Sequence, residues 1–186
     1  MVIMGLEDEL LRALNGYTPQ PQPKLPANLA DLFRASQPQQ RPVVRLAKPK
    51  VFVSFDYDND RNYKRLLEAW SANSRFQFTF HDKTPQEIQS NSVGRIKAVL
   101  TTKVQEASHV LVLVGQYANQ RHRDAQEIGH INWIHFECNQ AMAYKKKLVA
   151  VLLQPANLLP NNILGATGIR VDSFNQTDII AALSRA

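Results

Sequence analysis

The stretch Lys50-Val51-Phe52-Val53-Ser54-Phe55 (KVFVSF) opens the pattern that decides the fold of this chain. It is a short apolar run rich in β-branched and aromatic residues, and further short apolar runs follow it. We expect strands at residues 51–55, 76–80, 109–114, 148–153 and 169–171. Longer segments of helical period separate these runs, and this alternation is typical of βαβ units with a mainly parallel sheet.

The segments between the strands predict four helices. They cover residues 60–72, 85–104, 131 to the lysines at 145–147, and 177–183. The first presents Tyr63, Leu66, Leu67 and Trp70 on one face, and the second begins near Pro85 and buries Ile88, Ile96, Val99 and Leu100. Five strands joined by right-handed crossovers favour an α/β, flavodoxin-like sheet of order 2-1-3-4-5 with helices on both faces. Its ligand crevice would lie between the first and third strands, beside the loops after Phe55 and Val114.

The region before Lys50 has a different composition. Leu6, Leu10, Leu11 and Leu14 recur at near-helical spacing, so we expect a short amphipathic helix within residues 1–16. Residues 17–49 are rich in proline and glutamine, which resist helix and sheet, and we interpret them as a linker. The α/β domain is then expected to span residues 50–186.

Composition excludes several classes of protein. The chain has 186 residues, 44% of them hydrophobic, which suits one domain with a core plus an appendage. No apolar run approaches the roughly 20 residues that cross a bilayer, and no secretory leader pattern is present, so we expect a cytoplasmic protein with no membrane partner. The single cysteine, Cys138, excludes an intrachain disulfide, and we expect no metal. The net charge of +6 is dispersed, and the run Lys145-Lys146-Lys147 suits a helix end, so no specific nucleic-acid partner is predicted.

The loop after the first strand, residues 56–61 (DYDNDR), holds three carboxylates. It lacks the glycine and glutamate that an EF-hand requires, because Arg61 and Leu67 occupy those positions. A magnesium-dependent phosphotransfer site using Asp56 and Asp58 remains an alternative, although Asp60 stands where that motif needs threonine. The simplest interpretation is that Asp60 caps the following helix. The chain contains no GxGxxG or GxxxxGK[ST] sequence.

Trp133 and Glu137 are four residues apart, so on a helix they share one face. An aromatic plane beside a carboxylate suits a glycosidic bond to a cationic heterocycle, since the carboxylate stabilises an oxocarbenium-like transition state. The same spacing is also common in helices where both residues only pack or face solvent. Two weaker candidates are Cys138 beside His135, for which a buried thiol is the favoured interpretation, and His81-Asp82, favoured as a polar turn.

Residues 50–57 (KVFVSFDY), 112–115 (VLVG) and 132–137 (NWIHFE) together resemble the TIR-like domain of the Thoeris anti-phage system. In that family a Ser-Phe strand opens the domain, and a Trp-x-x-x-Glu helix carries the catalytic glutamate. The resemblance implies a TIR fold with Glu137 as the catalytic residue and Trp133 as the motif's tryptophan. It also implies cleavage of the nicotinamide bond of NAD by hydrolysis or cyclisation, often with release of a cyclic ADP-ribose isomer as an infection signal.

On this interpretation NAD is the substrate, no further cofactor is needed, and Glu137 faces the nicotinamide ribose. The substrate-binding residues would be Ser54, Phe55, Asp56, Tyr57, Gly115, Gln116, Tyr117 and Trp133. A homo-oligomer or TIR–TIR assembly is expected, with a downstream effector reached through the nucleotide product. The alternative is a non-catalytic TIR-like module that binds a nucleotide or a protein partner. Residues 117–132 (YANQRHRDAQEIGHIN) are longer than the link typical of the family, and would lid the pocket or contact a neighbouring subunit.

Overall fold

The computed structural model describes residues 48–186 except 74–75, 82–87, 89 and 91. The predicted helix within residues 1–16 and nearly all of the predicted linker lie outside these described residues. The strands are β1 (Lys50–Ser54), β2 (Thr79–His81), β3 (His109–Val114), β4 (Lys147–Leu152) and β5 (Ile169–Val171). They form one sheet of order β2-β1-β3-β4-β5 in which each neighbouring pair is parallel. The flavodoxin-like topology predicted from the sequence is therefore confirmed.

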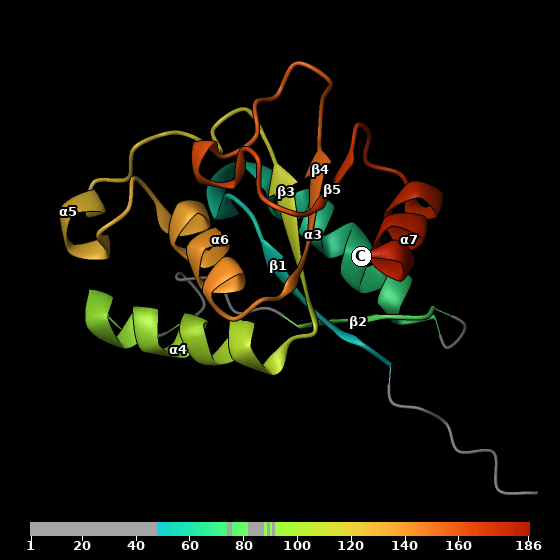
Figure 1. Ribbon diagram of the computed structural model, residues 1–186, viewed down its shortest axis with the longest axis horizontal. Coiled ribbons are helices and arrows are strands. Elements are labelled where there is room, and N and C mark those ends of the chain that lie inside the picture. The colour runs from blue at the N-terminus through green and yellow to red at the C-terminus, as the bar shows by residue number, and fades with distance from the viewer. Residues whose placement is uncertain (1–47, 74–75, 82–87, 89, 91) are drawn as a thin grey trace, which may run out of the picture. The chain divides into compact units, whose positions relative to one another are not determined.

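Helices cover both faces of this sheet (Figure 1). The described helices are α3 (Tyr57–Ser71), α4 (Val93–Glu106), α5 (Ala125–Ile128), α6 (Trp133–Ala143) and α7 (Gln176–Arg185), with a 3-10 turn, η2 (Asn161–Ile163). One hydrophobic core joins the sheet to α4, α5 and α6, and a second joins it to α3 and α7. None of the helices in the described part of the chain is both long and apolar enough to cross a bilayer.

The two cores follow from the alternation of side chains along the strands. In β3, Val110 and Val112 face the core beneath α4 and α6, whereas Leu111 and Leu113 face the core beneath α3 and α7. All six residues of this strand are buried. Such burial on both faces explains why the strand is a continuous apolar run, as expected for the centre of a parallel sheet.

Some predicted elements differ from those observed, and helix caps account for part of the difference. The second strand is Thr79–His81 rather than 76–80, and Leu66, predicted to pack, is 47% exposed. The helix predicted from Pro85 begins at Val93, because the Ser92 side chain accepts the backbone N–H of Arg95 and caps it. The single helix predicted from Ile131 is preceded by a separate short helix, α5, which ends at Gly129 in the left-handed conformation (φ 75°).

Candidate functional site

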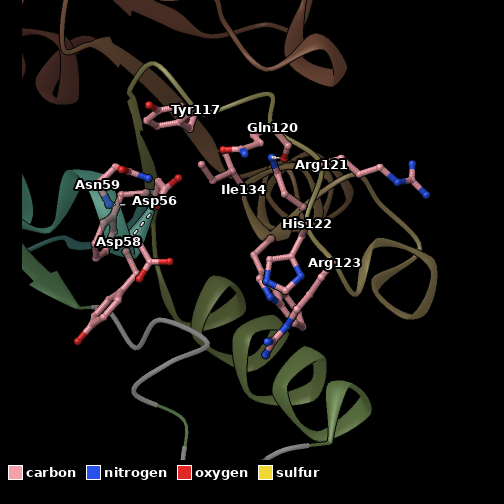
Figure 2. A pocket seen from close by; sticks show the side chains of 13 residues that line it. Asp56, Asp58, Asn59, Tyr117, Gln120, Arg121, His122, Arg123 and Ile134 are labelled. Carbon is pink, nitrogen blue, oxygen red and sulfur yellow. Dashed lines mark hydrogen bonds between the residues drawn. The ribbon is translucent and has the colours of Figure 1, made fainter.

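A cavity of about 490 Å³ lies beyond the carboxyl ends of β1 and β3, where the strand order predicts a ligand site. Figure 2 shows this cavity and the side chains around it. Three segments provide its lining. They are the loop after β1 with the first turn of α3 (residues 55–59), the segment after β3 (Tyr117 and residues 120–123), and the start of α6 (residues 132–134).

Asp56, rather than Asp60 as predicted, caps α3. Its Oδ1 accepts the backbone N–H of Asp58 at 3.0 Å and that of Asn59 at 3.2 Å. The helix therefore begins at Tyr57, three residues earlier than expected. This shift turns the first helical turn, with Asp58 and Asn59, toward the cavity.

Asp60 is buried instead, with 6% of its surface exposed. Its Oδ2 has no hydrogen-bond partner, and a Cβ placed on Gly115 would overlap both of its carboxylate oxygens. Burial disfavours the charged form, and the nearby charge of Asp56 adds to this effect, so the pKa of Asp60 rises to about 6. Gly115, at the end of β3, is thus the residue that leaves room for this carboxyl group.

Ser54 and Glu137 are joined by a hydrogen bond beneath the cavity. The hydroxyl of Ser54, the last residue of β1, donates to Glu137 Oε2 at 2.5 Å. Ser54 is fully buried and Glu137 is 3% exposed. Neither residue lines the cavity, whereas Trp133 and Ile134, one turn earlier on α6, do. The predicted catalytic carboxylate therefore lies deeper in the protein than the aromatic ring with which it was paired.

Trp133 has both a packing role and a place at the cavity. Its ring meets Phe136 edge-on, with centroids 5.9 Å apart, and meets His122 at 6.3 Å. Only 8% of its surface is exposed. The ring therefore joins the core under α6 to the wall formed by residues 120–123.

Asn132 fixes that wall. Its Oδ1 accepts the backbone N–H of His135 and caps α6, while its Nδ2 donates to the carbonyls of Ala118 at 2.9 Å and Gln120 at 2.8 Å. The backbone N–H of His122 donates to the carbonyl of Ile131 at 2.6 Å. The segment 117–132, predicted as a lid or a subunit contact, thus forms part of the pocket wall and is anchored to the start of α6.

The structure brings five of the nine predicted site residues to the cavity: Phe55, Asp56, Tyr57, Tyr117 and Trp133. Ser54, Gly115 and Glu137 are buried beside or beneath it, and Gln116 is exposed outside it. The prediction did not include a further set of lining residues: Asp58, Asn59, Gln120, Arg121, His122, Arg123, Asn132 and Ile134. The charged run QRHR at 120–123 is the sequence signal that could have indicated four of them.

The other chemical candidates find little support. Among the residues that the structure describes, no group of three or more His, Cys, Asp and Glu side chains is placed to hold a metal ion. Cys138 is fully buried, and burial raises the pKa of its thiol. His135 Nε2 pairs with Asn119 Oδ1 at 3.0 Å rather than with the thiol. The side chains of His81 and Asp82 lie outside the described residues.

A second cavity, of about 720 Å³, lies at the amino ends of β4 and β5 and is lined partly by Lys145, Lys146, Lys147 and Arg185. Ligands of open parallel sheets bind at the opposite, carboxyl edge. Moreover, Lys146 Nζ donates to the carbonyl of Gln105 near the end of α4, which accounts for one of these cations structurally. The cavity between β1 and β3 is therefore the candidate functional site.

A comparison with known proteins finds the same family that the sequence motifs at residues 50–57, 112–115 and 132–137 resemble. Residues 52–157, which include the cavity and the Ser54–Glu137 pair, match the family model described as "Thoeris protein ThsB, TIR-like domain". No curated protein matches the chain significantly. Among solved structures, a prokaryotic SEFIR domain is similar at 13% sequence identity with a TM-score of 0.47, over 74% of this chain and 95% of that one. The family match covers more than half of the sequence, and this chain therefore belongs to the Thoeris ThsB TIR-like family.

Proposed function

We propose that this protein cleaves the bond between nicotinamide and ribose in NAD, with Glu137 as the catalytic carboxylate. It would act as an NAD glycohydrolase or an ADP-ribosyl cyclase in the cytoplasm during anti-phage defence. The proposal rests on family membership together with one observation of the site, the hydrogen bond from Ser54 to Glu137. That bond fixes one carboxylate oxygen at the carboxyl end of β1, directly beneath the cavity.

Cleavage of the nicotinamide–ribose bond is helped by a carboxylate, because positive charge develops on the ribose as nicotinamide leaves. An oriented carboxylate offsets that charge, and such fixed electrostatic stabilisation usually contributes more to catalysis than any other single effect. The cavity offers Trp133 and Tyr57 as aromatic surfaces for a planar base. Water, or another atom of the same dinucleotide, then captures the ribosyl cation, giving ADP-ribose or a cyclic product.

Glu137 must become accessible for this reaction. Because it is 3% exposed and does not line the cavity, the side chains above it have to move apart when substrate binds. We propose that self-association of the TIR-like domain favours this open state, so that the rate per mole of protein rises with protein concentration. A cyclic nucleotide product would then reach a separate effector as a diffusible signal.

The burial of Glu137 also favours a second function. A carboxylate held by a buried serine hydroxyl is equally suited to tie β1 to α6, as in a non-catalytic TIR-like module that binds a nucleotide or a protein. In that case the cavity binds a ligand without cleaving it. The two functions differ in whether nicotinamide is released.

The decisive experiment incubates the full chain with NAD over a range of protein concentrations and measures free nicotinamide. Glu137→Gln keeps the side-chain shape and an acceptor for Ser54 while removing the charge. The matched control is Glu127→Gln, an exposed glutamate on α5. We expect the first variant to lose about 10²–10³-fold of the rate and the control to lose none. Absence of nicotinamide release by the wild type at every concentration would support the binding module instead.

A further inference from the structure

The two sides of the cavity carry opposite charge. Asp56, Asp58 and Asn59 form one side, here named the acidic wall, and Arg121, His122 and Arg123 form the other, the basic wall. Figure 2 shows the two sets on opposite sides of the cavity. The sequence did not predict that the two walls form a pair, because they belong to separate loops at the ends of β1 and β3.

The basic wall carries positive charge that the protein does not neutralise fully. Arg121 forms no ion pair with any residue that the structure describes, and Arg123 meets Asp124 at 3.5 Å with 88% of its side chain exposed. In Figure 2 the Arg121 side chain extends away from the acidic wall. Since this side chain is exposed, rotation about its bonds can bring the guanidinium to a ligand.

His122 is held as a hydrogen-bond donor. Its Nδ1 accepts the backbone N–H of Asp124 at 3.1 Å, so in the neutral ring the proton resides on Nε2. The ring also rests edge-on against Trp133, and the backbone at this position is bonded to Ile131. The His122 ring and the backbone beside it are therefore in place before any ligand arrives, which lowers the entropic cost of binding at this residue.

The acidic wall offers carboxylate oxygens that can bind a cationic group. Asp56 is partly engaged in capping α3 through Oδ1, whereas the Asp58 side chain has no hydrogen bond or ion pair with the described residues. The wall also lies close along the chain to Ser54, whose hydroxyl holds Glu137.

We propose that the cavity binds an extended dinucleotide in one direction, with its pyrophosphate on Arg121, His122 and Arg123 and its cationic base toward Asp58. This assignment rests on the proposed function for the identity of the dinucleotide, and it adds an anion subsite in the segment 117–132. Arginine suits a pyrophosphate because its planar guanidinium makes paired, charge-assisted hydrogen bonds with phosphate oxygens. The opposite charges of the two walls set this direction, because each end of the dinucleotide then lies against the wall of complementary charge.

The test measures binding of the two halves of the dinucleotide separately, by calorimetry on the full chain. ADP-ribose carries the pyrophosphate, and nicotinamide riboside carries the cationic base. The first variant is the double substitution Arg121→Gln with Arg123→Gln, and the second is Asp58→Asn. Arg65→Gln, an exposed arginine on α3 that does not line the cavity, is the matched control.

We expect the double variant to weaken ADP-ribose binding at least about tenfold while changing nicotinamide riboside binding less than about twofold. Asp58→Asn should do the reverse, and Arg65→Gln should change neither. Equal losses for both probes, unchanged ADP-ribose binding in the double variant, or no ADP-ribose binding by the wild type would overturn the assignment. ADP-ribose lacks the bond to be cleaved, so a protein that releases no nicotinamide but binds ADP-ribose in this pattern would refute only the proposed catalysis.

Discussion

Ser54 Oγ, at the carboxyl end of β1, lies 2.5 Å from Glu137 Oε2 on α6 and donates a hydrogen bond to that carboxylate. The two residues are 83 positions apart in sequence, and both are buried. The bond therefore links the first strand of the sheet to the helix that starts at the cavity. It gives the carboxylate a fixed orientation and contributes to the packing of α6.

Ser54→Ala removes this donor from a buried carboxylate. A hydrogen bond to a charged group stabilises by roughly 1.5–3 kcal/mol, so we expect a loss of about 2 kcal/mol in the free energy of unfolding, measured with urea. Ser184→Ala is the control, because that exposed serine bonds only to the carbonyl of Ile180. Equal stabilities of Ser54→Ala and the wild type would show that the bond adds nothing to the fold.

Asp60 makes stability depend on pH. Its pKa rises from 3.8 to about 6 on folding, so the native state binds the proton more tightly than the unfolded chain does. The contribution is full below pH 3.8 and is lost as pH rises through about 6; the shift corresponds to roughly 3 kcal/mol at most. Asp60→Asn should therefore gain stability relative to the wild type as pH rises from about 4 to about 6. Parallel urea midpoints across that range would contradict this.

Gly115→Ala places a methyl group where the carboxyl of Asp60 lies. We expect a loss of about 1–3 kcal/mol, as for other overpacked sites, because the buried carboxyl has little room to move. Asp60→Ala should recover much of that loss when combined with Gly115→Ala, and a double-mutant cycle measures the coupling. Additive effects would mean that the two residues do not compete for the same space.

Asn132→Asp separates the two roles of Asn132. The carboxylate still accepts the N–H of His135 and caps α6, but it can no longer donate to the carbonyls of Ala118 and Gln120. Amide hydrogen exchange should accelerate in residues 118–123 and stay near its wild-type rate within α6. Asn132→Ala, which also loses the cap, should accelerate both segments. Unchanged exchange in Asn132→Asp would show that the wall is held by other contacts.

The strands and their order could be predicted from the sequence because apolar runs such as His109–Val114 are buried on both faces of the sheet. Helix starts were predicted less well. Asp56 and Asp60 are both plausible caps by residue type, and the choice depends on packing, since Asp60 is drawn into the space beside Gly115. No local pattern distinguishes the two.

The candidate site was predicted only in part, because its geometry also depends on tertiary packing. Helical spacing placed Trp133 and Glu137 on one helix and one face, and the topology placed that helix near the crevice. The spacing carries no information on depth, so the burial of Glu137 under the cavity was missed. Residues 117–132 were expected to lid the pocket or to contact a neighbouring subunit. Their role as a fixed wall was missed, because Asn132 holds them through hydrogen bonds to carbonyls 12 and 14 residues away.

The most direct test of the proposed NAD cleavage is nicotinamide release by the wild type and by Glu137→Gln, with native folding of both confirmed by their unfolding midpoints. We predict a wild-type rate of release per mole of protein that increases with protein concentration, and about 10²–10³-fold slower release by Glu137→Gln. A Glu137→Gln variant that releases nicotinamide at the wild-type rate would contradict the assignment of Glu137 as the catalytic carboxylate.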